Sequence, residues 1–241
     1  MRKPDLFWHD AGVSRRRFAA VIAIIAAFWM VGAPAAVADP GVRPPGPPYR
    51  IVVIGDSITG GSNEGGNGPD GWPEIAWNSL RGQGIDVVPA VSGQGGSGYV
   101  QRGTAGTIYG EEAARLTAPD DSVILFFGSR NDGSAPIEEV SGAAHDAFTN
   151  ARRVAPAAKL VVVGPVWPAP DVFPPVAAIR DTLRQQAKET GAIWVDPIAE
   201  GWLTGPDLIG ADGTHPNNAG HVEMAGRMEA IIKSALGLSP R

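Results

Sequence analysis

The sequence predicts a three-layer α/β sandwich built around a parallel sheet of five strands. Short apolar runs alternate with longer segments of helical period along most of the chain, as in βαβ units. Three of these runs are continuously apolar and rich in valine, isoleucine and phenylalanine, which is typical of parallel strands covered by helices on both faces. No internal repeat is apparent, so we expect one domain.

The predicted elements alternate regularly. The strands are expected at residues 51–54, 85–91, 123–127, 160–163 and 193–195. The helices are expected at residues 72–81, 138–154, 176–190 and 218–236. Loops at residues 55–57, 93–98 and 128–132 follow the first three strands. Because ligand sites of open parallel sheets lie beyond the carboxyl ends of the strands, these three loops should meet at one edge.

The first forty residues differ in composition from the rest. A basic segment at 14–18 resembles the twin-arginine export motif, an apolar stretch follows at 19–31, and small residues stand at 36–38. This order predicts an export signal over 1–38, cleaved near Ala38, with an uncleaved membrane anchor as the alternative. A linker rich in proline and glycine is expected at 39–49, followed by a single folded domain at 50–241.

Charge and cysteine content exclude some functions. Without residues 1–38 the chain keeps 15 basic and 23 acidic residues, a net charge of −8, which argues against sequence-independent binding to nucleic acid. The chain has no cysteine, so disulfides, thiolate metal sites and a cysteine nucleophile are excluded. Association with the cell envelope and the oligomeric state stay open.

Two distant motifs carry candidate catalytic groups. Ser57 follows Gly55-Asp56 directly after an apolar run, and His215 lies three residues after Asp212 near the C-terminus. A serine hydroxyl needs a base to take its proton, and the base needs a carboxylate to fix its tautomer. Ser57 could otherwise simply cap a helix. Together the motifs predict Ser57 as nucleophile, His215 as base and Asp212 as the orienting carboxylate.

Acyl transfer also requires donors for the developing oxyanion. Asn131, just after an apolar strand, is expected to donate its side-chain amide, and a glycine of residues 93–98 its backbone N–H. That loop also matches a dinucleotide-binding pattern, but it follows the second strand and no helix or acidic partner is predicted after it. His215, His221 and Glu223 fit no closed metal-ligand spacing.

Two further positions have alternative interpretations. Arg130 and Asp132 flank Asn131, and either they contact substrate or they pair with each other. Trp167 lies in a proline-rich loop at 164–175, which is expected to form a wall of the substrate pocket.

These motifs, in their order, resemble the four blocks of the SGNH (GDSL-type) hydrolase family across nearly the whole predicted domain. The resemblance implies a flavodoxin-like sandwich, Ser-His-Asp catalysis, no metal or organic cofactor, and an oxyanion hole of the Ser57 N–H, a glycine N–H and the Asn131 amide. The second block lacks its usual leading asparagine, so Gly93, Gly95 or Gly96 could supply the N–H; Gly96 is chosen because the residues around it look most like family members. The third block has two residues, Ser129-Arg130, where one is usual.

The sequence thus predicts an exported serine esterase acting on a small-molecule or glycan ester through an acyl-enzyme. An acyltransferase to sugar or cell-wall hydroxyls would use the same residues. A catalytically idle module that binds glycan or lipid is the alternative from another class, although binding alone requires none of these residues in these roles.

Overall fold

The structure, a computed structural model, describes residues 46–238. The predicted export signal and most of the predicted linker therefore lie outside the described residues. Five parallel strands form one sheet in the order β2-β1-β3-β4-β5. Their bounds are Tyr49–Gly55 for β1, Val87–Gly93 for β2, Asp121–Phe127 for β3, Lys159–Val163 for β4 and Ile193–Val195 for β5.

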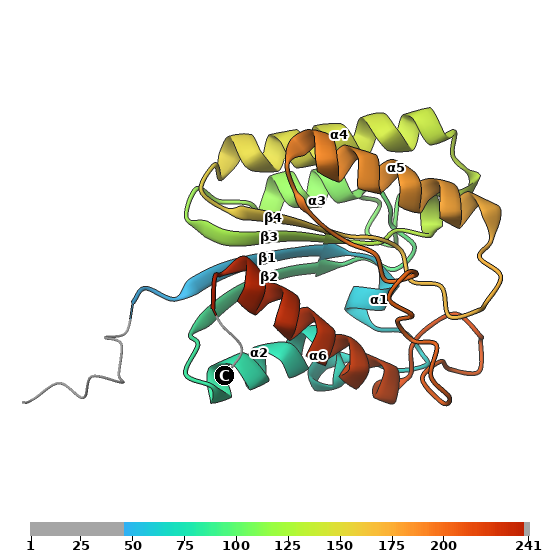
Figure 1. Cartoon of the computed structure of the whole chain (residues 1–241), viewed down its shortest axis with the longest axis horizontal. Helices are drawn as coiled ribbons and strands as arrows, with labels where there is room; N and C mark the ends of the chain where they lie inside the picture. The colour runs from blue at the N-terminus through green and yellow to red at the C-terminus, as the bar shows by residue number, and fades with distance from the viewer. Residues whose placement is uncertain (1–45, 239–241) are drawn as a thin grey trace, which may run out of the picture. The chain divides into compact units, whose positions relative to one another are not determined.

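Helices cover both faces of the sheet (Figure 1). One layer holds α3 at Tyr109–Leu116, α4 at Ile137–Val154 and α5 at Pro174–Thr190. The opposite layer holds α1 at Ser57–Gly60, α2 at Trp72–Gly82 and α6 at Asn218–Ala235. The predicted α/β fold with a five-stranded parallel sheet is confirmed, and its strand order is that of flavodoxin-like sheets.

Alternation along the central strands explains the two layers. Ile51 and Val53 of β1 face the core with α2 and α6, whereas Val52 and Ile54 face the core with α3, α4 and α5. All four are fully buried. A strand buried on both faces must be apolar at every position, which is why the run reads as continuous rather than alternating.

Two local features differ from the sequence-based expectation. Strand β2 begins at Val87, two residues later than predicted, because the Ile85 N–H closes the end of α2 by donating to the Leu80 carbonyl at 3.0 Å. Helix α3 was not predicted at all. It has only eight residues after a glycine-rich loop, so its hydrophobic period is too short to recognise.

The strand order places the site. The connection after β1 leads to β2 on one side, and the connection after β2 crosses back over β1 to β3 on the other side. The carboxyl ends of β1 and β3 therefore flank a topological switch point. The loops that begin at Asp56 and Gly128 leave the sheet there. The three glycine-containing loops therefore open on the same edge, as expected.

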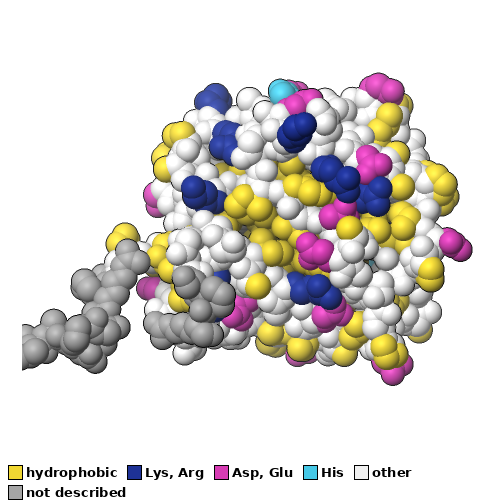
Figure 2. All heavy atoms as spheres, viewed as in Figure 1, with side chains coloured by type: hydrophobic (Ala, Val, Ile, Leu, Met, Phe, Trp, Pro, Cys, Tyr) yellow, Lys and Arg dark blue, Asp and Glu magenta, His cyan; other side chains and the backbone are white. Residues whose placement is uncertain are grey.

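Apolar surface and a hollow lie away from the carboxyl ends of the strands. Figure 2 shows apolar side chains gathered along the middle of the viewed face. A hollow of about 490 Å³ lies at the start of β4 and β5, lined in part by Leu160, Ile193 and Ala235. None of the predicted site residues lines it.

Within residues 46–238, no helix has the length and apolar character needed to cross a membrane.

Candidate active site

Ser57 lies at the first position of α1, immediately beyond β1. The turn is tight, since a Cβ on Gly55 would lie 2.2 Å from the Thr59 Oγ1. The Asp56 carboxylate caps the helix by accepting the Ile58 N–H at 2.8 Å. Glycine and aspartate before the serine are thus explained by local structure, and they hold Ser57 at the switch point of the sheet.

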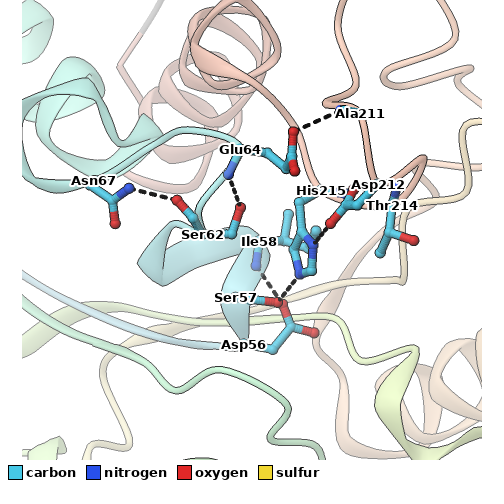
Figure 3. A network of polar contacts seen from close by, with 10 residues as sticks. All are labelled: Asp56, Ser57, Ile58, Ser62, Glu64, Asn67, Ala211, Asp212, Thr214 and His215. Atoms are coloured by element: carbon cyan, nitrogen blue, oxygen red, sulfur yellow. Dashed lines mark hydrogen bonds and ion pairs between the residues drawn. The ribbon is translucent and has the colours of Figure 1, made fainter.

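Ser57, His215 and Asp212 form a continuous hydrogen-bonded chain (Figure 3). The Ser57 Oγ lies 2.8 Å from the His215 Nε2, and the His215 Nδ1 lies 2.6 Å from the Asp212 Oδ2. A histidine that donates from Nδ1 to a carboxylate keeps Nε2 free to accept the serine proton. The structure therefore brings together all three predicted residues across 158 positions of sequence.

The turn that carries Asp212 and His215 is held in two ways. The Asp212 Oδ1 accepts the backbone N–H groups of Thr214 at 2.8 Å and His215 at 2.9 Å. The hydrogen bond from the His215 side chain, with these two bonds, lowers the pKa of Asp212 to about 2. Asp212 is therefore ionised at neutral pH, as an orienting carboxylate must be.

Glu64 is a supporting residue that the sequence reasoning missed. Its Oε2 accepts the Ala211 N–H at 2.7 Å, which ties the loop after α1 to the turn before Asp212 (Figure 3). The two residues are 147 positions apart, and no motif connects them. Only the tertiary structure shows that the nucleophile segment and the base segment support each other.

Asn131 lies beside the residue that precedes the nucleophile. Its Nδ2 donates to the Ser97 carbonyl at 2.9 Å and to the Asp56 Oδ2 at 3.2 Å. The loops after β1, β2 and β3 are thus joined through one amide group. Because both amide hydrogens have acceptors within the protein, an oxyanion on substrate would have to compete with Ser97 or Asp56 for one of them.

The candidate glycines occupy different environments. Gly96 is exposed, with a φ of 74°, and no atom lies within 4 Å of the position of its missing Cβ. Gly93 instead packs against the end of α1, where a Cβ would lie 2.4 Å from the Gly60 nitrogen. Gly95 lies between them, with Thr104 as its neighbour. Gly93 is therefore in direct contact with the helix that begins at Ser57, whereas Gly96 is at the tip of its loop.

Arg130 and Asp132 are not paired with each other in the described structure. Asp132 is 1% exposed, and its carboxylate accepts the backbone N–H groups of Tyr99, Val100 and Gln101 at 2.8–2.9 Å. The Arg130 guanidinium instead lies over the Trp167 ring, 4.7 Å from its centroid. Of the two alternatives, mutual pairing is wrong, and Asp132 anchors the loop after β2.

The remaining candidates from the last helix do not form a metal site. His221 is fully buried, and its Nδ1 accepts the Trp72 N–H at 3.2 Å. Glu223 pairs with Arg227 on the same helix. Over residues 46–238, no three His, Cys, Asp or Glu side chains are grouped so that they could hold a metal ion.

Burial changes the pKa of two groups near the site in opposite directions. It raises the pKa of Asp56 from 3.8 to about 6, and it lowers the pKa of His221 from 6.5 to about 4. The folded protein therefore binds the Asp56 proton more tightly than the unfolded chain does, and the His221 proton less tightly. The contribution of Asp56 to the free energy of unfolding therefore decreases as the pH rises from 3.8 to about 6. The contribution of His221 decreases as the pH falls from 6.5 to about 4.

We expect these two contributions to oppose each other in the wild type between about pH 4 and pH 6. In His221→Gln the remaining Asp56 contribution should make the free energy of unfolding decrease with rising pH relative to wild type, by up to about 3 kcal/mol over the interval. Asp56→Asn should show the reverse slope. Urea unfolding at several pH values measures both, and slopes parallel to the wild type in both variants would contradict the assignment.

Comparison with known proteins places this geometry in a family. Residues 53–222 match the sequence model of the GDSL-like Lipase/Acylhydrolase family. The chain is 42% identical over 190 residues to the GDSL lipase Rv0518 of Mycobacterium tuberculosis, covering 77% of this chain and 82% of that protein. The matched range contains Ser57, Asn131, Asp212 and His215.

Solved structures agree on the fold. The crystal structure of TesA has a TM-score of 0.65 and 21% identity, covering 78% of this chain and all of that chain. A carbohydrate esterase family 2 enzyme with a carbohydrate-binding domain, from Corynascus thermopiles (Myceliophthora fergusii), has a TM-score of 0.62 and 20% identity, covering 81% and 69% respectively. At these identities the likeness establishes the architecture and not the substrate.

Proposed function

The chain belongs to the GDSL-like lipase/acylhydrolase family and is a carboxylic ester hydrolase, and from this premise we propose that it cleaves esters by a Ser57-His215-Asp212 acyl-enzyme mechanism. The observation that carries the proposal is the hydrogen-bonded chain from the Asp212 Oδ2 through His215 to the Ser57 Oγ. The link between Ser57 and His215 has the length of a normal hydrogen bond, and the 2.6 Å link between His215 and Asp212 is short, in the direction expected for a bond to an ionised carboxylate.

In the proposed mechanism, the His215 Nε2 takes the Ser57 proton while the Ser57 Oγ attacks the carbonyl carbon of the ester. The protonated His215 then gives that proton to the leaving alcohol, and the acyl group stays on Ser57. Water attacks the acyl-enzyme in the same way, which releases the carboxylic acid and restores Ser57. Asp212 holds the imidazole and stabilises its positive charge throughout.

The oxyanion is proposed to be held by the Ser57 N–H, the Asn131 amide and one glycine N–H. Gly96 is the candidate from sequence, while contact with α1 supports Gly93. Loss of one such donor typically costs about 10² to 10³ in rate. The bond between Asn131 and Asp56 supports a role for Asp56 in aiming the amide.

The proposed substrates are short-chain esters, including O-acyl groups on polysaccharide. The side chains of His215 and Asp212 are 26% and 37% exposed, so the catalytic groups lie close to solvent rather than at the base of a deep pocket. A shallow site can bind a short acyl group without an enclosed apolar channel.

We expect turnover of p-nitrophenyl esters to be highest for acetate and butyrate and to decline toward palmitate. The reason is that a long acyl chain would leave most of its apolar surface in water at a shallow site. The measurement is kcat/KM across the series under conditions in which every ester is monomeric. A maximum at palmitate would refute the short-chain proposal while leaving the esterase assignment in place.

Export is proposed from the basic, apolar and small-residue order of residues 1–38. Cleavage after Ala38 would release a domain whose first strand begins ten residues later, at Tyr49. Mass spectrometry of protein from the culture medium of an expressing bacterium should then find a mature chain that starts at Asp39. An intact N-terminus in the membrane fraction would favour the anchor instead.

A further inference from the structure

Arg130 stands apart from the other arginines of the described chain. Residues 46–238 contain ten arginines, and nine of them donate a hydrogen bond to a carboxylate, amide or carbonyl oxygen. Arg130 has no such partner among the described residues, although it is partly buried. Partial burial of a guanidinium without a protein acceptor is unfavourable, because N–H donors that lose contact with water gain no hydrogen bond in exchange.

The position of Arg130 is at the candidate active site. It directly precedes Asn131, whose amide contacts Asp56 beside the nucleophile. The negative charges of Asp56 and Asp212 both act on the guanidinium, which places it within electrostatic range of the two segments that carry Ser57 and His215. None of its nitrogen atoms is both fully buried and without a hydrogen-bond partner, so the guanidinium remains accessible to solvent.

Two aromatic side chains form the surface on which the Arg130 guanidinium lies. The Arg130 group lies 4.7 Å from the centroid of the Trp167 ring, and Trp167 in turn stacks on Phe173 with an interplanar angle of 20°. The Trp167 Nε1 donates to the Asp171 carbonyl at 2.9 Å, which fixes the ring within its proline-rich loop. A guanidinium held over an aromatic face makes a cation–π contact that leaves its N–H donors free to bind an oxyanion, and two of these donors can bind a carboxylate or phosphate together.

We propose that Arg130, held on Trp167, is a specificity subsite that binds a carboxylate or phosphate group on the ester substrate. The proposal rests on the proposed esterase function and narrows its substrate class to esters that carry a second, anionic group. In this proposal Ser57, His215 and Asp212 cleave the ester, and Arg130 determines which esters bind. Phe173, 53% exposed at the start of α5, continues the apolar side of the subsite.

The test compares matched pairs of esters with wild type and Arg130→Met. One pair places the charge on the acyl side, p-nitrophenyl hemiglutarate against p-nitrophenyl pentanoate. The other places it on the alcohol side, 4-acetoxybenzoate against its methyl ester. Arg130→Met should lower kcat/KM at least tenfold for the charged member of one pair, and the affected pair identifies the side of the site. The neutral members should change less than threefold.

Two control variants separate charge from packing. Arg130→Lys keeps the charge but loses the planar fork, so its loss should lie between wild type and Arg130→Met. Arg153→Met, on the exposed side of α4, should change neither pair. Equal losses on charged and neutral esters, or no loss on either, would overturn the proposal by showing that Arg130 only packs against Trp167.

A binding measurement keeps the inference separate from catalysis. Calorimetric titration of Ser57→Ala protein with the same uncleaved esters should show tighter binding of the charged member of one pair, with at least a tenfold loss when Arg130→Met is added. If wild type cleaves no ester, the esterase proposal fails and this titration still decides the fate of the subsite. Equal binding of charged and neutral members would overturn it.

Discussion

Ser57→Ala should lower kcat/KM for p-nitrophenyl acetate by about 10⁴- to 10⁶-fold, the range of losses seen when members of a Ser-His-Asp triad are replaced. The substitution removes the hydroxyl oxygen that lies 2.8 Å from the His215 Nε2 and is proposed to attack the ester. The oxyanion donors remain, so a small residual rate above the uncatalysed reaction is expected.

The variant should fold normally, because the Ser57 side chain contributes a single partly buried hydrogen bond. Urea unfolding should therefore give a stability within about 1 kcal/mol of wild type. Ser79→Ala, on the exposed side of α2, is the matched control and should retain full activity. Activity of Ser57→Ala near that of wild type would refute the nucleophile assignment.

Asp132→Ala should destabilise the protein by about 3–5 kcal/mol, the largest stability effect we expect from a single carboxylate. The carboxylate accepts three backbone N–H groups of residues 99–101 while it is 1% exposed. Alanine would leave these three donors without an acceptor in a space too enclosed for free access of water. Asp132→Asn retains one acceptor oxygen and should give an intermediate loss.

The matched control is Asp120→Ala, because the Asp120 side chain is 80% exposed and lies 3.9 Å from Arg50. That change should alter stability by less than about 0.5 kcal/mol. Asp132→Asn should also lower kcat, since the loop that Asp132 anchors contains Gly93, Gly96 and the Ser97 carbonyl that holds Asn131. A loss of stability no larger than that of Asp120→Ala would contradict the anchoring role.

Sequence patterns were sufficient for the sheet and most helices. A strand covered on both faces must be apolar throughout, so β1, β3 and β4 could be recognised from composition alone. Long helices such as α4 and α6 repeat their apolar period often enough to be recognised. Short elements do not, and α3, with eight residues, was missed for that reason.

The sequence by itself determined which residues are the candidates for catalysis. Ser57, Asp212 and His215 lie in motifs whose local turns hold each side chain, namely the Asp56 cap and the paired bonds to the Asp212 Oδ1, and such turns depend on neighbours in sequence. Their assembly into one hydrogen-bonded chain follows from a parallel sheet, because its carboxyl ends share one edge.

Only the tertiary structure decided what surrounds those residues. Three sets of contacts join segments that share no sequence pattern. They are the hydrogen bond between Glu64 and Ala211, the three hydrogen bonds that Asp132 accepts from the loop after β2, and the contact of Arg130 with the Trp167 ring. Each depends on the distance and direction between side chains from different loops, which packing of the whole domain sets. Local sequence therefore specified the candidate catalytic groups, whereas the contacts that orient them and change their pKa values arose from long-range packing.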